Sequence, residues 1–172
     1  FGIMSDFIKR TQADVKEWKT DFSAPVSAFF INSLSKREKF DRIVSFLKSA
    51  DWIIPNYSYI DEMCMVFSTE LNYENHQMKM EIFKEFIKIV EGNLAKFLTN
   101  HMAGMPKTEF QNIIQEFGHL ESLKTFRLLV TMADFDVFHM FMHDRNLELD
   151  AEATRGVYNK RNLQSSSHWP RQ

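Results

Sequence analysis

The sequence predicts an all-α protein, built as a compact bundle of about six helices with an extra helical arm at the N-terminus. Apolar residues recur at alternating spacings of three and four along most of the chain, and helix-start signals precede several of these runs. No segment shows the apolar and polar alternation that is typical of a strand. The length of 172 residues and the 44% hydrophobic content fit one domain with a sizeable core.

The segment from Met78 to Leu98 is the expected central helix, entered near Glu74. Its apolar side chains cover roughly half of the helix circumference, and its charged residues fall on the other side. An apolar face this broad must be covered from two directions, by neighbouring helices or by a ligand. We expect this to be the longest helix of the core, with an inward face made by Met80, Ile82, Phe83, Phe86, Ile87, Ile89, Val90, Leu94, Phe97 and Leu98.

Residues 1–34 form the expected N-terminal arm. Ser5 or Asp6 can cap a first helix, in which apolar residues follow at helical spacing up to Phe22. The aromatic segment from Ala24 to Leu34 is long enough for only a helical turn or two. We expect it to pack on the main body.

The main domain is expected over residues 35–160, and its first helix starts after Ser35. Ser35 and Glu38 have the spacing of a capping box, and apolar residues at helical spacing follow as far as Ala50. Asp51–Pro55 reads as a connector, with Pro55 at the first position of the next helix. That helix is expected to point Tyr57, Ile60, Met63, Cys64 and Phe67 inward.

Three further helices are expected after the central one. A loop over 99–107 precedes a short helix that starts with a second candidate capping box, Thr108 with Gln111, and ends at Gly118. Another helix begins at Leu123. Asp134 is positioned to cap a final helix that carries Phe135, Phe138, Phe141 and Met142, and residues 161–172 are expected to be a flexible tail.

Composition and charge exclude several classes of protein. The net charge of −2 gives no basic surface for a phosphate backbone, so nucleic acid is not an expected partner. No apolar run is long enough to span a bilayer, and the N-terminal residues lack the pattern of a signal peptide. Cys64 has only apolar neighbours and is expected to be a small buried group. These features indicate a cytoplasmic protein.

No constellation of residues in the sequence supports catalysis, and no cofactor is expected. His139 and His143 stand four apart and can share a metal ion, but no third ligand or general base accompanies them, so two surface histidines are the favoured interpretation. Asp61 and Glu62 lie on a helix face that is expected to be exposed to solvent. The remaining signal is the supply of 17 Phe and ten Met residues, which suits either a packed core or a groove for an amphipathic helix.

The order of these features resembles the BART-like domain, a helical module named for binding Arf-like small GTPases. The resemblance covers about residues 37–155, and its most specific part is the Asp-Phe-x-x-Phe signature at Asp134, Phe135 and Phe138. The connector with Asp51, Trp52, Ile54 and Pro55 resembles the branch found at the head of a ciliary coiled-coil protein.

This resemblance implies a non-enzymatic effector in the cytoplasm or cilium, which takes the N-terminal helix of a GTP-bound Arf-like GTPase into an apolar groove. The alternative is a structural component of a ciliary or other assembly, whose groove holds a fixed partner helix. The expected groove residues are Met63, Phe67, Phe86, Val90, Phe110, Ile114, Phe117, Phe126, Phe135, Phe138 and Met142, with Asp61, Glu70 and Glu74 at the rim.

Overall fold

A computed structural model describes the backbone of residues 26–68 and 75–166 and the side chains as far as residue 156. Within these ranges every regular element is a helix, which confirms the all-α fold. The predicted helix of the arm, the rim residues Glu70 and Glu74, and residues 167–172 lie outside the described part.

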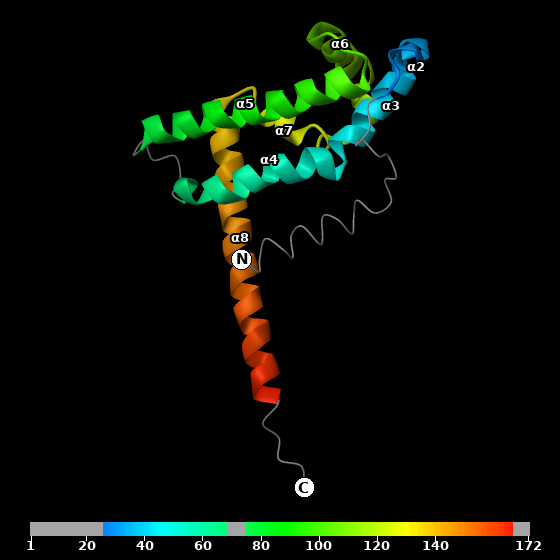
Figure 1. The fold of residues 1–172 in the computed structure, drawn as a ribbon. Coiled ribbons are helices and arrows are strands. Elements are labelled where there is room, and N and C mark those ends of the chain that lie inside the picture. Colours follow the sequence, from blue (N-terminus) through cyan, green and yellow to red (C-terminus); the bar gives the residue numbers. More distant parts are fainter. Residues whose placement is uncertain (1–25, 69–74, 167–172) are drawn as a thin grey trace.

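Figure 1 shows how the helices are arranged. Helices α4 and α5 run side by side across the molecule, α2, α3 and α6 gather at one end, and α8 crosses at the other end before it projects away from the body. The described elements are, in chain order, α2 (Ala28–Ser33), α3 (Lys36–Leu47), α4 (Ala50–Met63), η1 (Cys64–Phe67), α5 (His76–His101), α6 (Lys107–Phe117), η2 (Gly118–Leu120), α7 (Arg127–Thr131) and α8 (Phe135–Ser166), where η marks a 3₁₀ helix.

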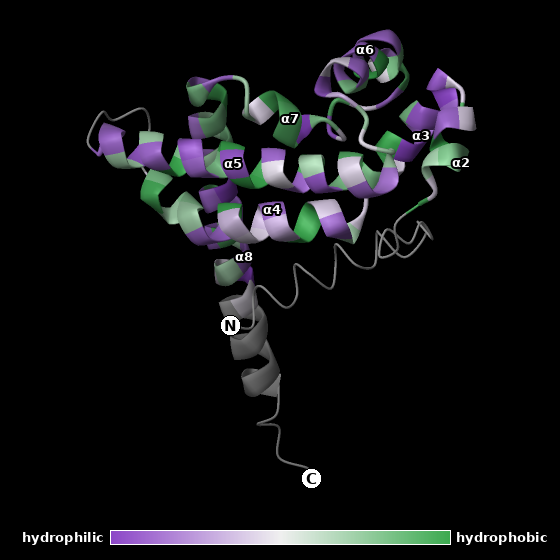
Figure 2. Ribbon diagram, turned by 45° about the horizontal axis from the view of Figure 1, so that its top comes forward, coloured by the Kyte–Doolittle hydropathy of each residue, from purple (hydrophilic) through white to green (hydrophobic). Residues whose placement is uncertain are grey.

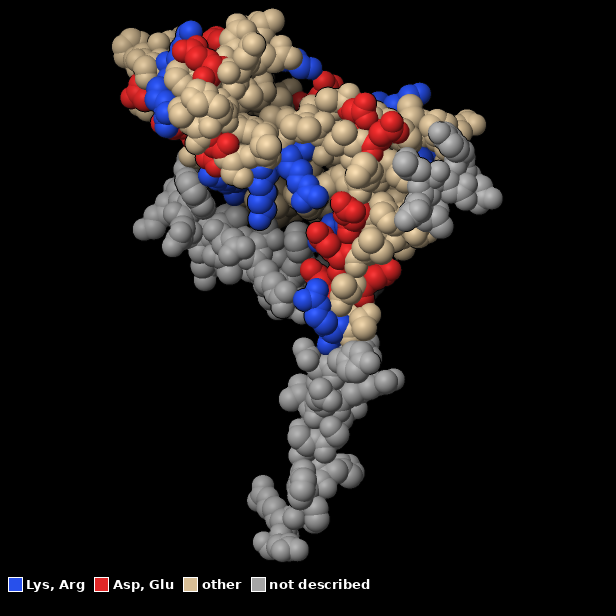
Figure 3. All heavy atoms as spheres, turned by 180° about the vertical axis from the view of Figure 1, so that it is seen from behind, with Lys and Arg blue, Asp and Glu red and all other residues tan. Residues whose placement is uncertain are grey.

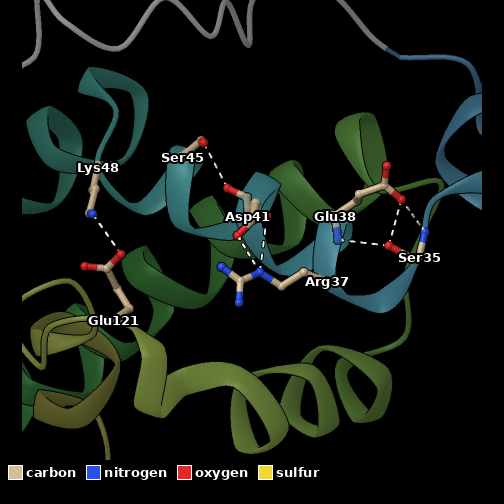
Figure 4. Close-up of polar contacts among 7 residues, drawn as sticks. All are labelled: Ser35, Arg37, Glu38, Asp41, Ser45, Lys48 and Glu121. Atoms are coloured by element: carbon tan, nitrogen blue, oxygen red, sulfur yellow. Dashed lines mark hydrogen bonds and ion pairs between the residues drawn. The ribbon is translucent and has the colours of Figure 1, made fainter.

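The predicted capping box starts α3. The Ser35 N–H donates to the Glu38 carboxylate at 2.8 Å, and the Glu38 N–H donates to the Ser35 hydroxyl at 3.3 Å (Figure 4). Lys39 of α3 forms an ion pair with Glu109 of α6, and Lys48, the C-cap of α3, forms one with Glu121, which follows η2. These contacts fix α3 against the α6 region at the edge of the core.

The expected connector before α4 is instead part of the helix. α4 begins at Ala50, so Pro55 lies inside it and not at its first position. The proline leaves only the Asp51 carbonyl without its helical donor, and both residues are exposed to water, which can take the place of that donor. The helical turn buries Trp52 against Phe46, with ring centroids 5.4 Å apart. Core packing of Trp52 therefore outweighs the loss of one hydrogen bond.

The central helix is α5, and most of its predicted inward face is buried. Figure 2 shows hydrophobic and hydrophilic residues alternating around α4 and α5, as expected for helices with one face in the core. Met80, Ile87 and Ile89 are only half-buried. α5 also runs three residues further than predicted, to His101, and it is not the longest helix, because α8 has 32 residues against 26.

Two predicted helix starts are wrong. α6 begins at Lys107 with Pro106 as its N-cap, so Thr108 already lies in the first turn and makes no side-chain cap. α7 begins at Arg127, because residues 123–126 form a turn in which the Phe126 N–H donates to the Leu123 carbonyl. Leu123 points into water with 82% of its surface exposed.

The predicted N-cap of α8 is confirmed. The Asp134 carboxylate oxygen Oδ1 accepts from the backbone N–H groups of Asp136 at 2.8 Å and Val137 at 3.1 Å. The helix continues to Ser166, so the boundary expected after residue 160 falls inside it. Nothing in residues 161–166 is a proline or glycine that would end the helix there.

Replacing Asp134 with Ala should lower the free energy of unfolding by about 0.5 to 2 kcal/mol, because two N–H groups at the start of α8 lose their acceptor. Urea denaturation measures the change. Asp134→Asn is the matched control and should keep most of the stability, since its amide oxygen can accept the same bonds. An unchanged denaturation midpoint for the Ala variant would show that the N-cap does not contribute to the stability of the domain.

Candidate functional site

The structure divides the predicted groove residues into two sets. Seven are buried in the core, and Phe138 lies at the centre of them, with ring centroids 5.5 Å from Phe67, 4.9 Å from Phe83 and 5.0 Å from Phe86. These side chains are at most 7% exposed and offer a partner almost no surface. The buried set is Phe67, Phe86, Val90, Phe110, Phe126, Phe138 and Met142.

The other four predicted groove residues, Met63, Ile114, Phe117 and Phe135, are half-buried and keep some surface in contact with water. Phe117 packs on Phe40 of α3, with ring centroids 5.7 Å apart. Phe135 packs at the start of α8 on Phe83 of α5, at 5.6 Å. The structure thus places Phe117 and Phe135 on different helices and does not bring their rings together.

Further half-buried apolar residues, which helical spacing alone did not single out for the site, come from the elements between these two. Met80 and Ile87 stand seven apart and so share one face of α5, and Leu129 and Met132 belong to α7 and the turn after it. In Figures 1 and 2, α7 lies next to α5, between α6 and the start of α8. We use the name apolar face for Met80, Ile87, Ile114, Phe117, Leu129, Met132 and Phe135.

Asp61 does not lie on an exposed rim, which corrects the sequence interpretation. Its side chain is 8% exposed and forms a bidentate ion pair with Arg145 of α8, which is 5% exposed, at 2.7 and 3.1 Å. Burial acts to lower the pKa of Arg145, but the hydrogen bonds and charges of Asp61 and Glu148 outweigh it and raise this pKa above the ordinary value. The pair joins α4 to α8 and is structural.

The chain matches one family model, that of the ARF-like 2 binding protein BART, over residues 35–151. This match spans more than half of the sequence and runs from the capping box of α3 into α8. The chain belongs to the BART family. α2 and the last part of α8 lie outside the matched residues.

The two histidines of α8 have defined hydrogen-bond partners. The Lys79 ammonium can only donate and lies 3.4 Å from Nε2 of His139, a nitrogen that accepts a hydrogen bond when the ring proton is on Nδ1. His143 donates from Nδ1 to the carbonyl of Phe67 at 2.9 Å. His139 is buried, so the interpretation of two surface histidines is wrong for it. Among the described residues no group of three potential ligands is placed to hold a metal ion.

The stability of this BART-family domain should fall as the pH drops below about 6.5, the ordinary pKa of histidine. Burial, and then the charges of Lys79 and His143, lower the pKa of His139, while Asp136 acts weakly in the opposite sense. The unfolded chain therefore takes up a proton on this residue at a higher pH than the folded one.

Thermal unfolding between about pH 7 and about pH 5 measures this effect. His139→Gln, whose amide oxygen can still accept from Lys79, should lose less stability over this range than the original chain. If the unfolding temperatures of the two proteins depend on pH in the same way, His139 is not the residue responsible for the loss of stability.

Cys64 is buried, as predicted, and burial followed by the charge of Asp61 raises the pKa of its thiol to about 11. The reactive thiolate is therefore scarce at neutral pH. None of the described helices has both the length and the apolar character needed to cross a bilayer.

Proposed function

We propose that this BART-family domain binds the N-terminal amphipathic helix of an Arf-like small GTPase in its GTP-bound form, and that the helix docks on the apolar face. Arf-like 2, for which the family is named, is the first GTPase to test. The observation that carries the proposal is the set of half-buried apolar side chains that α5, α6, α7 and the start of α8 present within the matched residues.

The chemistry of the apolar face suits an amphipathic helix. Such a helix carries its apolar anchors at i, i+3, i+4 and i+7, and it needs a receiving surface of large side chains that are fixed in place but still reach the solvent. Phe117 and Phe135 are held from behind by Phe40 and Phe83, so little conformational entropy is lost when a partner covers them. Met80 and Met132 add side chains that adapt to the shape of the partner.

The seven buried residues predicted for the groove support this surface from below. Phe86, Val90 and Phe138 have no exposed area. Their part in binding is to fix the positions of the helices that carry the apolar face. The same division explains why substitutions in the two sets should behave differently.

Single polar substitutions on the apolar face test the proposal. Ile87→Gln, Ile114→Gln and Leu129→Gln should each unfold near the temperature of the original domain, since part of each side chain is already in water. At least one should bind a fluorescent peptide of the Arf-like 2 N-terminal helix more than tenfold more weakly, a loss of about 1.4 kcal/mol.

Met140→Gln is the matched control. Met140 is also apolar and is 61% exposed, but it is not part of the apolar face. Its affinity for the peptide should be unchanged. If all three variants keep full affinity, or if every variant that loses affinity is also unfolded, the proposed docking surface is incorrect.

A further inference from the structure

α8 presents a second apolar surface, on the side turned away from the core. Val137, Met140 and Leu147 are 41%, 61% and 52% exposed. Their spacings place them within a sector of about 80° on the helix, which also holds the exposed Asp144, and Ala151 continues the same line. Phe138, Met142 and Arg145 are buried on the other side of α8. We call Val137, Met140, Leu147 and Ala151 the outer stripe.

α8 also continues beyond the body of the molecule, as Figure 1 shows. Sixteen of its residues follow Asp150, up to Ser166. Most of the stability of a helix in a protein comes from tertiary packing of its apolar face, so a part that leaves the body gains little from the rest of the molecule. A partner that packs along α8 would both cover the outer stripe and stabilise this extension.

The charges along α8 are ordered. Residues 135–152 carry five acidic side chains and one base, Arg145, which is already paired with Asp61. Residues 153–166 carry three bases, Arg155, Lys160 and Arg161, and no acid. Figure 3 shows acidic side chains gathered where α8 leaves the body, with a basic group just beyond them.

We propose that the outer stripe binds a second copy of this chain through an antiparallel α8–α8 contact. In this arrangement the acidic first half of each helix lies against the basic last half of the other, and the symmetry axis passes near Ala151. A parallel pair would instead place like charges side by side. A basic helix from another protein would match the acidic half alone and leave the basic half without a counterpart.

Sedimentation velocity of the full chain over a range of concentrations tests the contact. The chain should form a dimer, and Leu147→Lys, which removes apolar contact and places a base opposite Arg155 of the other copy, should raise its dissociation constant at least tenfold while the unfolding temperature stays the same. Arg155→Glu should also weaken the dimer, most strongly at low salt. Phe29→Glu is the matched control, because Phe29 is 86% exposed on α2, outside the outer stripe, and should leave the dimer intact.

Cysteine cross-linking tests the direction of the helices, in a background where Cys64 is changed to Ala. In an antiparallel pair only residues near the axis meet their own copies, so Ala151→Cys should form a disulfide-linked dimer and Met140→Cys should not. A monomer at every concentration, a dimer that is not weakened by Leu147→Lys, or equal cross-linking at both positions would each overturn the proposal. These variants lie outside the apolar face, so the outcome is separate from that for the GTPase helix.

Discussion

Replacing Phe138 with Ala is expected to lower the free energy of unfolding by about 3 to 5 kcal/mol, one of the two largest effects that the structure predicts. The ring is fully buried and lies within 5.5 Å of the ring centroids of Phe67, Phe83 and Phe86. Its removal leaves a cavity where α8 and η1 meet α5, and the packed neighbours can fill that cavity only in part. Urea denaturation gives the measurement.

Phe29→Ala is the control for this prediction. Phe29 is the same residue type but is 86% exposed on α2, so its loss should change stability by no more than about 0.5 kcal/mol. A Phe138→Ala domain that keeps its stability but no longer binds the GTPase helix would contradict this account. Phe138 would then be a groove residue that contacts the partner, as the sequence analysis predicted.

The second large effect is expected at the ion pair between Asp61 and Arg145. Asp61→Ala should cost about 3 to 5 kcal/mol, because it leaves the Arg145 guanidinium, 5% exposed, without its bidentate acceptor. Glu148, which bonds Nη1 of Arg145 at 3.0 Å, can replace only part of the lost interaction. Glu62→Ala, at an exposed carboxylate next in the chain, is the control and should have little effect.

A double variant shows whether the loss of stability in Asp61→Ala comes from the unpaired charge that is left on Arg145. Asp61→Leu with Arg145→Met removes both charges and fills the space with apolar atoms, so it should recover most of the stability lost by Asp61→Ala. If Asp61→Ala is as stable as the original chain, the pair does not hold α8 to α4. The description of Asp61 as a structural residue would then be wrong.

The fold could be predicted from the sequence where the signal is local. The capping box at Ser35 and the N-cap at Asp134 depend on residues within three positions of each other, and both are present. The same kind of signal failed at Thr108, because α6 begins two residues earlier than a cap at that position requires. Pro55 misled the placement of α4 because burial of Trp52, a tertiary effect, decides where that helix begins.

The site was harder to predict, because helical spacing tells which side of a helix faces inward and not how deep each residue lies. Phe138 and Phe135 stand three apart on the predicted inward face, yet the first is fully buried and the second is only half-buried. Asp61 and Arg145 are 84 positions apart, and no local pattern links them. The burial of a side chain and the ion pairs between helices depend on the angles at which the helices cross, and sequence periodicity gives no information about those angles.

Whether the domain is an effector of an Arf-like GTPase can be measured with full-length Arf-like 2. The experiment compares the affinity of the domain for this GTPase locked in its GTP-bound form and in its GDP-bound form. An effector should bind the GTP-bound form at least tenfold more tightly, and Ile114→Gln or Leu129→Gln should weaken that binding. Equal affinity for the two forms, with the apolar-face variants still weakened, would favour a fixed helix-holding role in an assembly. No binding to either form would contradict the proposal that this GTPase is a partner.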